Sequence, residues 1–472
     1  MILNMIGKCL AIGALGLFVF MAAPIFAQSV PQNRDQIRLS YAPLVKNAAP
    51  AVVNIYAKRL VRSRGRASLF NDPIFNRLFG DFPLRGFSRE RLENSLGSGV
   101  IVRAAGFIVT NNHVIDKAQE ITVVLSDRRE FDAHLVVADK RTDIAVLKVD
   151  TKGENLPFLK PGDSDALEVG DLVLAVGNPF GVGQTVTSGI VSALARTSVG
   201  ISDFRSFIQT DAAINPGNSG GALLAMNGKL VGVNTAIYSR DGGSLGLGFA
   251  VPSNMVRRIL DSAISGKPLV RPWFSFTGKP VTSEIANALG LERPVGILIE
   301  KVSRNGPGKR AGLLPGDVVV AVGRHDVDDV QALRFRIATK PIGESVDLKV
   351  VRRGNLRSLQ FDLVAPPEDP PRNLTLISGR NPFAGATVGN LSPAFSEEIG
   401  IESSLKGVIV VKVDKRSTAA RLGLRPNDII RALNGAKMRR VIDLERTAAV
   451  PKPRWNIDLQ RGTRTIQFQV SG

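Results

Sequence analysis

An internal repeat in the second half of the chain is the feature that most constrains its fold. The stretch Gly-Ile-Leu-Ile-Glu-Lys-Val at 296–302 matches Gly-Val-Ile-Val-Val-Lys-Val at 407–413, a spacing of 111 residues. The same spacing aligns the turn and following strand at 311–319 with those at 422–430. Matching stretches at one fixed spacing indicate two copies of one structural unit. We therefore expect two similar small domains after residue 266.

Glycine and proline mark the ends of these units. The first part of the chain ends at Ser-Gly-Lys-Pro, 265–268, and the proline-rich stretch 365–373 predicts a stiff linker. We expect one domain at 28–266, a second at 267–364 and a third at 374–472. A chain of 472 residues is long enough for about three domains, each with its own core.

The first 27 residues predict a secretory signal peptide. They carry one positive charge at Lys8, an apolar run at 9–23 and a small residue, Ala27, at the expected cleavage point. An uncleaved N-terminal anchor is the alternative. The chain's one cysteine, Cys9, lies in this segment, so the mature chain would have no disulfide, thiol nucleophile or zinc–thiolate site. We predict an exported, periplasmic protein.

The chain is strongly basic, with a formal net charge of +19, and most of the surplus follows residue 266. Such a surplus can attract nucleic acid, acidic substrates or anionic membrane surfaces. Because the sequence carries no nucleic-acid-binding motif, we favour a solvated surface without a nucleic-acid partner and leave membrane-surface association open. Neither a phosphate-binding glycine loop nor a metal-ligand spacing is present, so we predict no cofactor and no metal.

A glycine-rich turn presents a candidate nucleophile. In Gly-Asn-Ser-Gly-Gly, 217–221, small residues let the backbone amides of Gly217 and Ser219 point at one spot, where they could stabilise an oxyanion. The hydroxyl of Ser219 needs a base to become a nucleophile. Taken alone, such a turn is a weak signal, because glycine-rich turns that contain serine are common.

Of the three histidines, His113 is the best candidate base, since it follows the strand-like runs 99–102 and 107–110. His134 lies in an alternating stretch that predicts a solvent-facing strand position, and His325 lies in a turn of a later domain. Asp143 opens the apolar run 144–149 and could orient the imidazole of His113, although a cap at the edge of a strand is the simpler interpretation.

The chain order His113, Asp143, Ser219 is that of two-barrel serine proteases, and differs from the order in subtilisins and α/β-hydrolases. Together these stretches resemble the signatures of the HtrA (DegP/Do-like) family, trypsin-like serine endopeptidases that carry PDZ domains. The stretches that carry the resemblance are 96–102, 110–115, 142–148, 175–181, 211–221 and 246–252.

This resemblance implies a mainly β fold, in which a trypsin-like double β-barrel precedes two PDZ domains, each an α+β, partly open β-barrel. It implies that Ser219 is the nucleophile, His113 the general acid and base, and Asp143 the residue that orients the histidine. It also implies a small apolar pocket, lined around Ile214 and Ile237, that accepts Val, Ile or Ala before the cut. An acid for a basic pocket could come only from Asp211.

PDZ domains bind an extended chain end as an added strand, and a loop of backbone amides takes its carboxylate. In the first copy we expect this loop at Trp273, Phe274, Ser275 and Phe276, although the family usually has glycine where this chain has Ser275. In the second copy we expect it at 385–388. Helices are expected at Val327–Thr339 and Val441–Ala449.

The resemblance and the apolar pocket together predict degradation of unfolded or damaged exported proteins. The alternative is a holding chaperone or peptide-sensing scaffold, in which cleavage is secondary. An insertion at 59–96 carries five phenylalanines among arginines; it is either a disordered loop or a partner surface. Related proteins use this loop between subunits, so we expect a homotrimer that can build larger cages.

Overall fold

The computed structural model describes residues 40–62, 90–178, 183–196, 206–215, 217–237, 246–402 and 405–471, with backbone alone at 60–62, 90–95, 195–196 and 236–237. The chain divides into two compact units, 1–43 and 44–472. The predicted signal peptide lies outside the described residues. Within the described part, no helix combines the length and apolar character needed to cross a bilayer.

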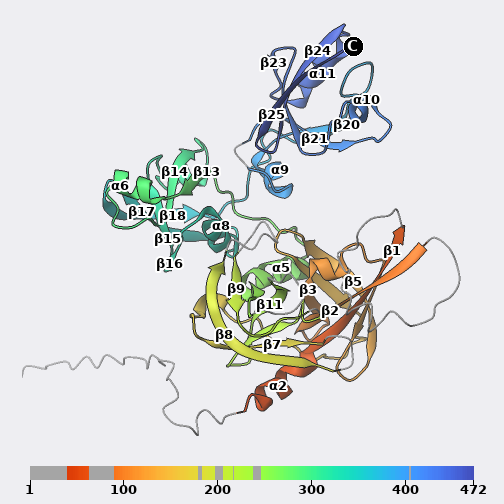
Figure 1. Ribbon diagram of the computed structural model, residues 1–472, viewed down its shortest axis with the longest axis vertical. Helices are drawn as coiled ribbons and strands as arrows, with labels where there is room; N and C mark the ends of the chain where they lie inside the picture. The colour runs from red at the N-terminus through yellow and green to blue at the C-terminus, as the bar shows by residue number, and fades with distance from the viewer. Residues whose placement is uncertain are drawn as a thin grey trace, which may run out of the picture. The chain divides into compact units, whose positions relative to one another are not determined.

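A closed antiparallel barrel forms first (Figure 1), in the strand order β1-β2-β3-β6-β5-β4. Strand β6 is an almost continuous buried run, whereas β5 is mostly exposed, and its alternation is interrupted where the pairing with β6 shifts register between Leu135 and Val137. The elements are α2 (Ala42–Ala48), η1 (Ala49–Ala51), β1 (Val52–Arg62), β2 (Glu90–Arg103), β3 (Phe107–Asn111), α4 (Asn112–Ile115), β4 (Glu120–Val124), β5 (Glu130–Asp139) and β6 (Ile144–Val149).

A second closed barrel follows, in the order β10-β11-β12-β9-β8-β7. Its core contains Val173, Val191, Ile208 and Leu223. A helix then returns from β12 and packs on β11 and on β5 and β6 of the first barrel, so it fastens the two barrels together. The elements are η2 (Ser164–Ala166), β7 (Leu172–Gly177), β8 (Thr185–Arg196), β9 (Phe207–Thr210), β10 (Ala222–Ala225), β11 (Leu230–Ile237), β12 (Gly248–Pro252) and α5 (Ser253–Ser265).

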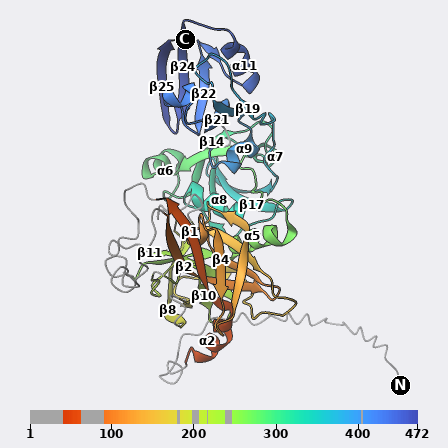
Figure 2. The ribbon, with the colours of Figure 1, turned by 90° about the vertical axis from the view of Figure 1, so that its right-hand side faces the viewer.

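The repeat folds as two separate sheets, each with its own core (Figure 2). The first sheet has the order β13-β14-β15-β17-β18, with β16 beside β15. Its elements are β13 (Phe276–Pro280), α6 (Ser283–Leu289), β14 (Ile297–Val302), α7 (Pro307–Arg310), β15 (Val318–Val322), β16 (His325–Asp326), α8 (Val330–Ala338), β17 (Ser345–Arg352) and β18 (Asn355–Asp362).

The second sheet repeats this order as β20-β21-β22-β24-β25, with β23 beside β22, and adds one strand, β19, outside β20. Its elements are β19 (Thr375–Leu376), β20 (Ala386–Asn390), α9 (Pro393–Glu398), β21 (Val408–Val413), α10 (Thr418–Arg421), β22 (Asp428–Leu433), β23 (Ala436–Lys437), α11 (Val441–Ala449), β24 (Arg454–Arg461) and β25 (Arg464–Ser471). The predicted double barrel followed by two similar α+β domains is confirmed.

Two predicted boundaries need correction. The helix expected at Val327–Thr339 begins at Val330, because the Asp329 side chain accepts a hydrogen bond from the Ala332 amide and caps the helix there. The insertion expected at 59–96 is shorter, since β1 and β2 stay paired as far as Arg62 and Glu90. Its five phenylalanines lie outside the described residues. The helix expected at Val441–Ala449 is found with those bounds.

Candidate active site

The register of two strands brings His113 and Asp143 together. Asn111, the last residue of β3, pairs with Ile144, the first residue of β6. His113 follows Asn111 by two residues in the short helix α4, and Asp143 comes directly before Ile144. The Asp143 carbonyl accepts hydrogen bonds from the Asn112 amide and the Asn111 side chain, both at 3.0 Å. Residues that are 30 positions apart in sequence therefore meet at one end of the first barrel.

The Asp143 carboxylate holds the imidazole in a fixed orientation. Its Oδ2 lies 2.6 Å from His113 Nδ1, and its Oδ1 accepts the His113 backbone amide at 2.9 Å. Asp143 is buried, with 6% of its surface exposed, whereas the His113 side chain is about half exposed. A buried carboxylate on Nδ1 leaves the other ring nitrogen, Nε2, to exchange protons with a substrate.

Thr235 on β11 joins the second barrel to this pair. Its Oγ1 donates to Asp143 Oδ2 at 2.8 Å, and its carbonyl accepts the Ser219 hydroxyl at 3.1 Å. A single residue thus contacts both the orienting acid and the candidate nucleophile. Sequence reasoning missed Thr235, because nothing in the run 230–237 distinguishes it from an ordinary buried strand threonine.

The loop that carries Ser219 is packed too closely for side chains. A Cβ on Gly220, which has φ of 85°, would lie 2.0 Å from the Ser98 carbonyl oxygen, and one on Gly221 would lie 2.3 Å from that of Val176. Ser98 also ties the loop down, since its amide donates to the Ser219 carbonyl at 2.8 Å and its hydroxyl donates to the Gly217 carbonyl at 2.6 Å. The glycines are needed for this close approach.

The predicted oxyanion donors are the backbone amides of Gly217 and Ser219. Over the ranges that the structure describes, neither the Gly217 nor the Ser219 amide donates a hydrogen bond. Over the same ranges, no hydrogen bond joins Ser219 to His113, because the Ser219 hydroxyl donates to Thr235. The structure brings the predicted His113, Asp143, Ser219 and Gly217 to one site, connected through Thr235.

The residues predicted to line the specificity pocket belong to the second barrel. Ile214 is buried in the core of the second barrel, and a Cβ on Gly248 of β12 would lie 2.9 Å from its Cδ1. Ile237 ends β11 opposite Gly248, but its side chain is outside the described residues. The Asp211 carboxylate accepts the Ile190 amide at 2.7 Å, and Asp211 itself is exposed.

Comparison with known proteins agrees with this site. A trypsin-like peptidase domain model matches residues 97–233, and a PDZ domain model matches 243–363. The chain is 34% identical over 478 residues to periplasmic serine endoprotease DegP of Escherichia coli, covering 96% of both chains. The chain belongs to the HtrA family of DegP-like serine endoproteases. It is a serine endopeptidase with PDZ domains.

Other relatives support the HtrA assignment. The chain is 39% identical to periplasmic serine endoprotease DegP of Salmonella typhimurium over 373 residues, which cover 79% of this chain and 75% of the relative. The solved structure of the HtrA-type protease AlgW with a tripeptide is 41% identical, with a TM-score of 0.51, and covers 70% of this chain and 99% of that one.

The loop predicted to bind chain ends lies at the start of the first PDZ domain. Trp273, Phe274 and Ser275 precede β13, which Phe276 begins. Ser275 is buried, and its hydroxyl accepts the Gly308 amide in the first turn of α7 at 2.8 Å. No strand of the described chain pairs with the outer edge of β13.

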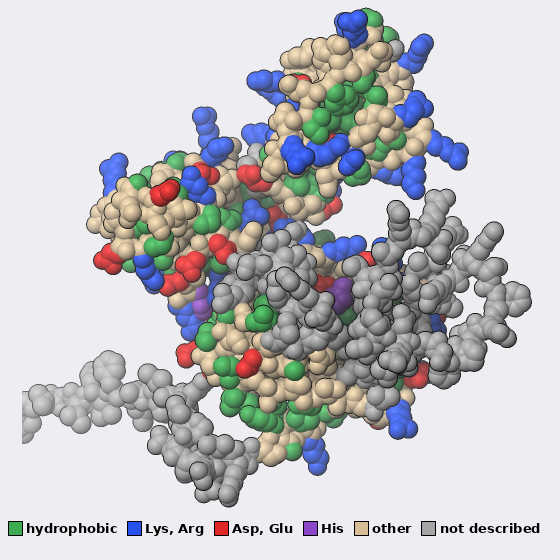
Figure 3. Space-filling view, viewed as in Figure 1, with side chains coloured by type: hydrophobic (Ala, Val, Ile, Leu, Met, Phe, Trp, Pro, Cys, Tyr) green, Lys and Arg blue, Asp and Glu red, His purple; other side chains and the backbone are tan. Residues whose placement is uncertain are grey.

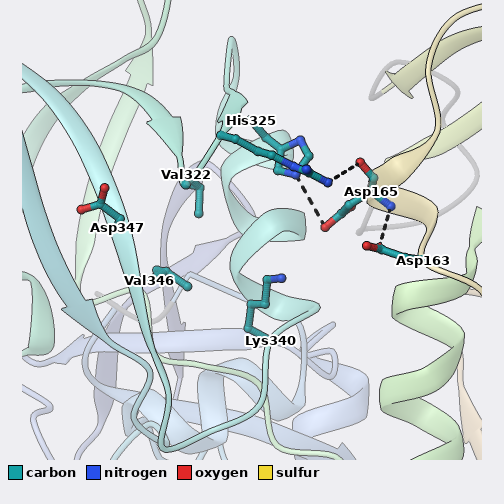
Figure 4. A pocket seen from close by; sticks show the side chains of 9 residues that line it. Asp163, Asp165, Val322, His325, Lys340, Val346 and Asp347 are labelled. Carbon is teal, nitrogen blue, oxygen red and sulfur yellow. Dashed lines mark hydrogen bonds and ion pairs between the residues drawn. The ribbon is translucent and has the colours of Figure 1, made fainter. Parts of the chain in front are cut away.

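Two remaining histidines of this HtrA protein lie away from the triad residues. His134 is exposed on β5, as predicted. His325 lines a hollow with Asp163, Asp165 and Lys340 (Figure 4). Arg336, outside this lining, donates to Asp165 at 2.6 Å. Burial, and next the charge of Arg336, lower the pKa of His325. Over the described residues, no group of acidic, histidine or cysteine side chains could hold a metal ion.

Proposed function

We propose that His113, Asp143 and Ser219 act as the catalytic triad of this endopeptidase. The observation that carries the proposal is the chain of contacts from His113 through Asp143 and Thr235 to Ser219, at 2.6, 2.8 and 3.1 Å. Three groups from two barrels meet there around one buried carboxylate. Such an arrangement suits acyl transfer to water.

In the proposed reaction the Ser219 hydroxyl turns from the Thr235 carbonyl to His113 and attacks the scissile carbonyl carbon. His113 takes the hydroxyl proton and gives it to the leaving amine, so the peptide C–N bond breaks and an acyl-enzyme forms. Water then attacks the acyl carbon while His113 takes a proton from it, and His113 gives this proton to the Ser219 oxygen as the acyl C–O bond breaks. The amides of Gly217 and Ser219 stabilise the oxyanion, and each such donor contributes about 3 kcal/mol.

We infer that the enzyme cleaves unfolded or damaged proteins after Val, Ile or Ala. The buried Ile214 beside Gly248, where even a Cβ would lie 2.9 Å from the Ile214 Cδ1, supports a small apolar pocket. The periplasmic endoproteases among its relatives support a periplasmic location, reached through the predicted signal peptide. PDZ domains bind chain ends, and we expect a homotrimer that can form larger cages, with the insertion between β1 and β2 as subunit contact.

Ser219→Ala tests the proposal. We expect cleavage of denatured casein to fall by about four orders of magnitude or more, while exposed Ser358→Ala on β18 should have no effect. Sequencing the products of the parent enzyme by mass spectrometry should show cuts after Val, Ile and Ala. Unchanged turnover by Ser219→Ala would disprove the triad, and cuts after Lys or Arg would disprove the pocket.

The same variant separates the holding-chaperone alternative. Light scattering of a heat-denatured client would show whether Ser219→Ala still suppresses aggregation. Retained suppression would mean that binding and cleavage are two activities of this chain, whereas equal cleavage of folded and unfolded casein by the parent enzyme would contradict selection for unfolded clients.

A further inference from the structure

The second PDZ domain has its peptide-binding edge covered by its own chain. Residues 372–377, which we call the docked segment, run antiparallel along the outer edge of β20. Thr375 and Leu376 form β19 opposite Val388 and Thr387. The pairing continues at both ends, because the Asn390 amide donates to the Arg372 carbonyl at 2.6 Å and the Ile377 amide donates to the Ala386 carbonyl at 2.9 Å.

The end of the docked segment resembles a bound chain end. The Ile377 carbonyl accepts the amide of Gly385 at 2.8 Å, and Gly385 belongs to the loop where a terminal carboxylate would be captured. The Ile377 side chain is 4% exposed and packs in the domain core, in the same cluster as Phe383 and Leu444 of α11. Leu374 and Leu376 are more than half exposed, as expected for alternate positions of an edge strand.

Polar anchors hold the start of the docked segment. Asn390 is buried; its side-chain nitrogen donates to the Pro371 carbonyl at 2.7 Å, and its side-chain oxygen accepts the Val441 amide at the start of α11 at 2.6 Å. Arg372 donates to Glu368 at 2.8 and 3.0 Å and lies 4.8 Å from the Phe395 ring centroid. Asn390 of β20 therefore links the chain at the start of the docked segment to α11, the other wall of the groove.

The first PDZ domain differs from the second in its open strand edge and in the charge beside its carboxylate loop. The outer edge of β13 is open within the described chain, and the Arg334 guanidinium of α8 lies 5.6 Å from the Phe274 ring centroid in the predicted carboxylate loop. At the spacing of 111 residues, Arg334 corresponds to Glu445 of α11. A cation near such a loop attracts a terminal carboxylate, whereas an anion repels it.

We propose that the docked segment is a built-in ligand of the second PDZ domain and closes its groove to other chain ends. Free chain ends then bind to the first domain alone, beside Arg334. This inference rests on the proposed binding of chain ends by PDZ domains. Basic side chains gather on the face of the second domain seen in Figure 3.

Hydrogen exchange of the whole Ser219→Ala chain tests the inference. Without any peptide, we expect slow exchange at residues 372–377 and 385–390. A ten-residue peptide with an apolar C-terminus and a free carboxylate should slow exchange at 273–280 and leave 372–390 unchanged. Fast exchange of the docked segment alone, or peptide-induced slowing at 385–390, would overturn the inference. If the peptide slowed exchange neither at 273–280 nor at 385–390, the proposed binding of chain ends would be contradicted. The docking of 372–377 is tested separately, by the exchange of that segment without peptide.

Two variants sharpen the test without opening the core. Leu376→Cys with Thr387→Cys lets a disulfide lock the exposed strand pair, and peptide affinity should match that of the reduced protein within twofold. A loss of binding on oxidation would show that the parent groove opens.

Arg334→Glu should weaken peptide binding at least tenfold, whereas the matched Glu445→Arg should leave it unchanged. Equal weakening by both would refute the assignment.

Discussion

In both PDZ domains a serine faces a glycine between the carboxylate loop and the start of the next short helix, but the two residues have exchanged places. In the first, Ser275 caps α7 from the loop before β13, and it faces Gly306, where a Cβ would lie 2.1 Å from that of Ser275. In the second, the serine is Ser417 at the start of α10, and it faces Gly385, where a Cβ would lie 2.1 Å away. Only one of the two positions can carry a side chain.

This exchange explains the departure from the family's usual glycine at Ser275. A hydroxyl is supplied to the helix N-terminus in both domains, by Ser275 to the Gly308 amide and by Ser417 to the Ala420 amide at 3.1 Å. The loop residue and the helix residue therefore have to be considered as a pair. The two domains do use the same residue types in another place, where a buried aspartate pairs with an arginine.

The largest predicted effect tests that shared feature. Asp317 and Asp428 are buried, and each accepts two hydrogen bonds, at 2.6 and 2.7 Å, from Arg352 and Arg461 respectively. These bonds raise the pKa of both arginines. Asp317→Ala and Asp428→Ala should each destabilise their own domain by about 3–5 kcal/mol, because an arginine loses its buried partner.

Urea unfolding followed by tryptophan fluorescence would measure these effects. The chain has two tryptophans, Trp273 in the first PDZ domain and Trp455 in the second. Changing either one to Phe, in the Ser219→Ala chain, leaves a signal from one domain. A loss below about 1 kcal/mol in either domain would mean that the pair acts as an ordinary surface salt bridge.

Gly385→Ala should have the next largest effect. Gly385 has φ of 86° and faces Ser417, so the new methyl group is both strained and overpacked. We expect a loss of about 3 kcal/mol in the second domain from the two causes together. The matched control is Gly423→Ala, which has φ of 77° and open space, and should lose only the conformational part. If unfolding followed by Trp455 fluorescence gave the same loss of stability for both variants, a steric contribution at Gly385 would be excluded.

Gly306→Ser should destabilise the first domain by about 1–3 kcal/mol, since two serine side chains would then compete for one space. Adding Ser275→Gly reproduces the arrangement of the second domain and should restore most of the lost stability. The Trp273 signal reports both variants. A single variant as stable as the parent, or a double variant no better than the single, would refute the exchange.

Acidification should produce the smallest effect, and only in the first domain. His325 of β16 corresponds to Ala436 of β23. Because burial and Arg336 lower the pKa of His325, the unfolded chain binds this proton more readily, and stability should fall as pH drops through 6.5, its ordinary value. Asp165 opposes the shift. Urea midpoints at pH 7.5 and 5.5 should differ more for the first domain, and His325→Ala should remove the excess.

The sequence by itself determined the double barrel, the two copies and the residues of the candidate triad. The glycines around Ser219, the buried run of β6 and the repeat are local patterns. Their physical causes, the lack of room for side chains and the continuous burial of a strand, can be seen in neighbouring residues. For this reason His113, Asp143 and Ser219 could be chosen before any coordinates.

Only the tertiary structure decided the role of Thr235, the exchange of serine between Ser275 and Ser417, and the docking of 372–377 on β20. Each depends on contact between segments distant in sequence, and such contacts are fixed by strand register and by the space left between packed elements. No local pattern shows which residues a buried strand threonine will contact, or which strand a short run after a proline-rich linker will pair with. Those partners are determined by the tertiary fold.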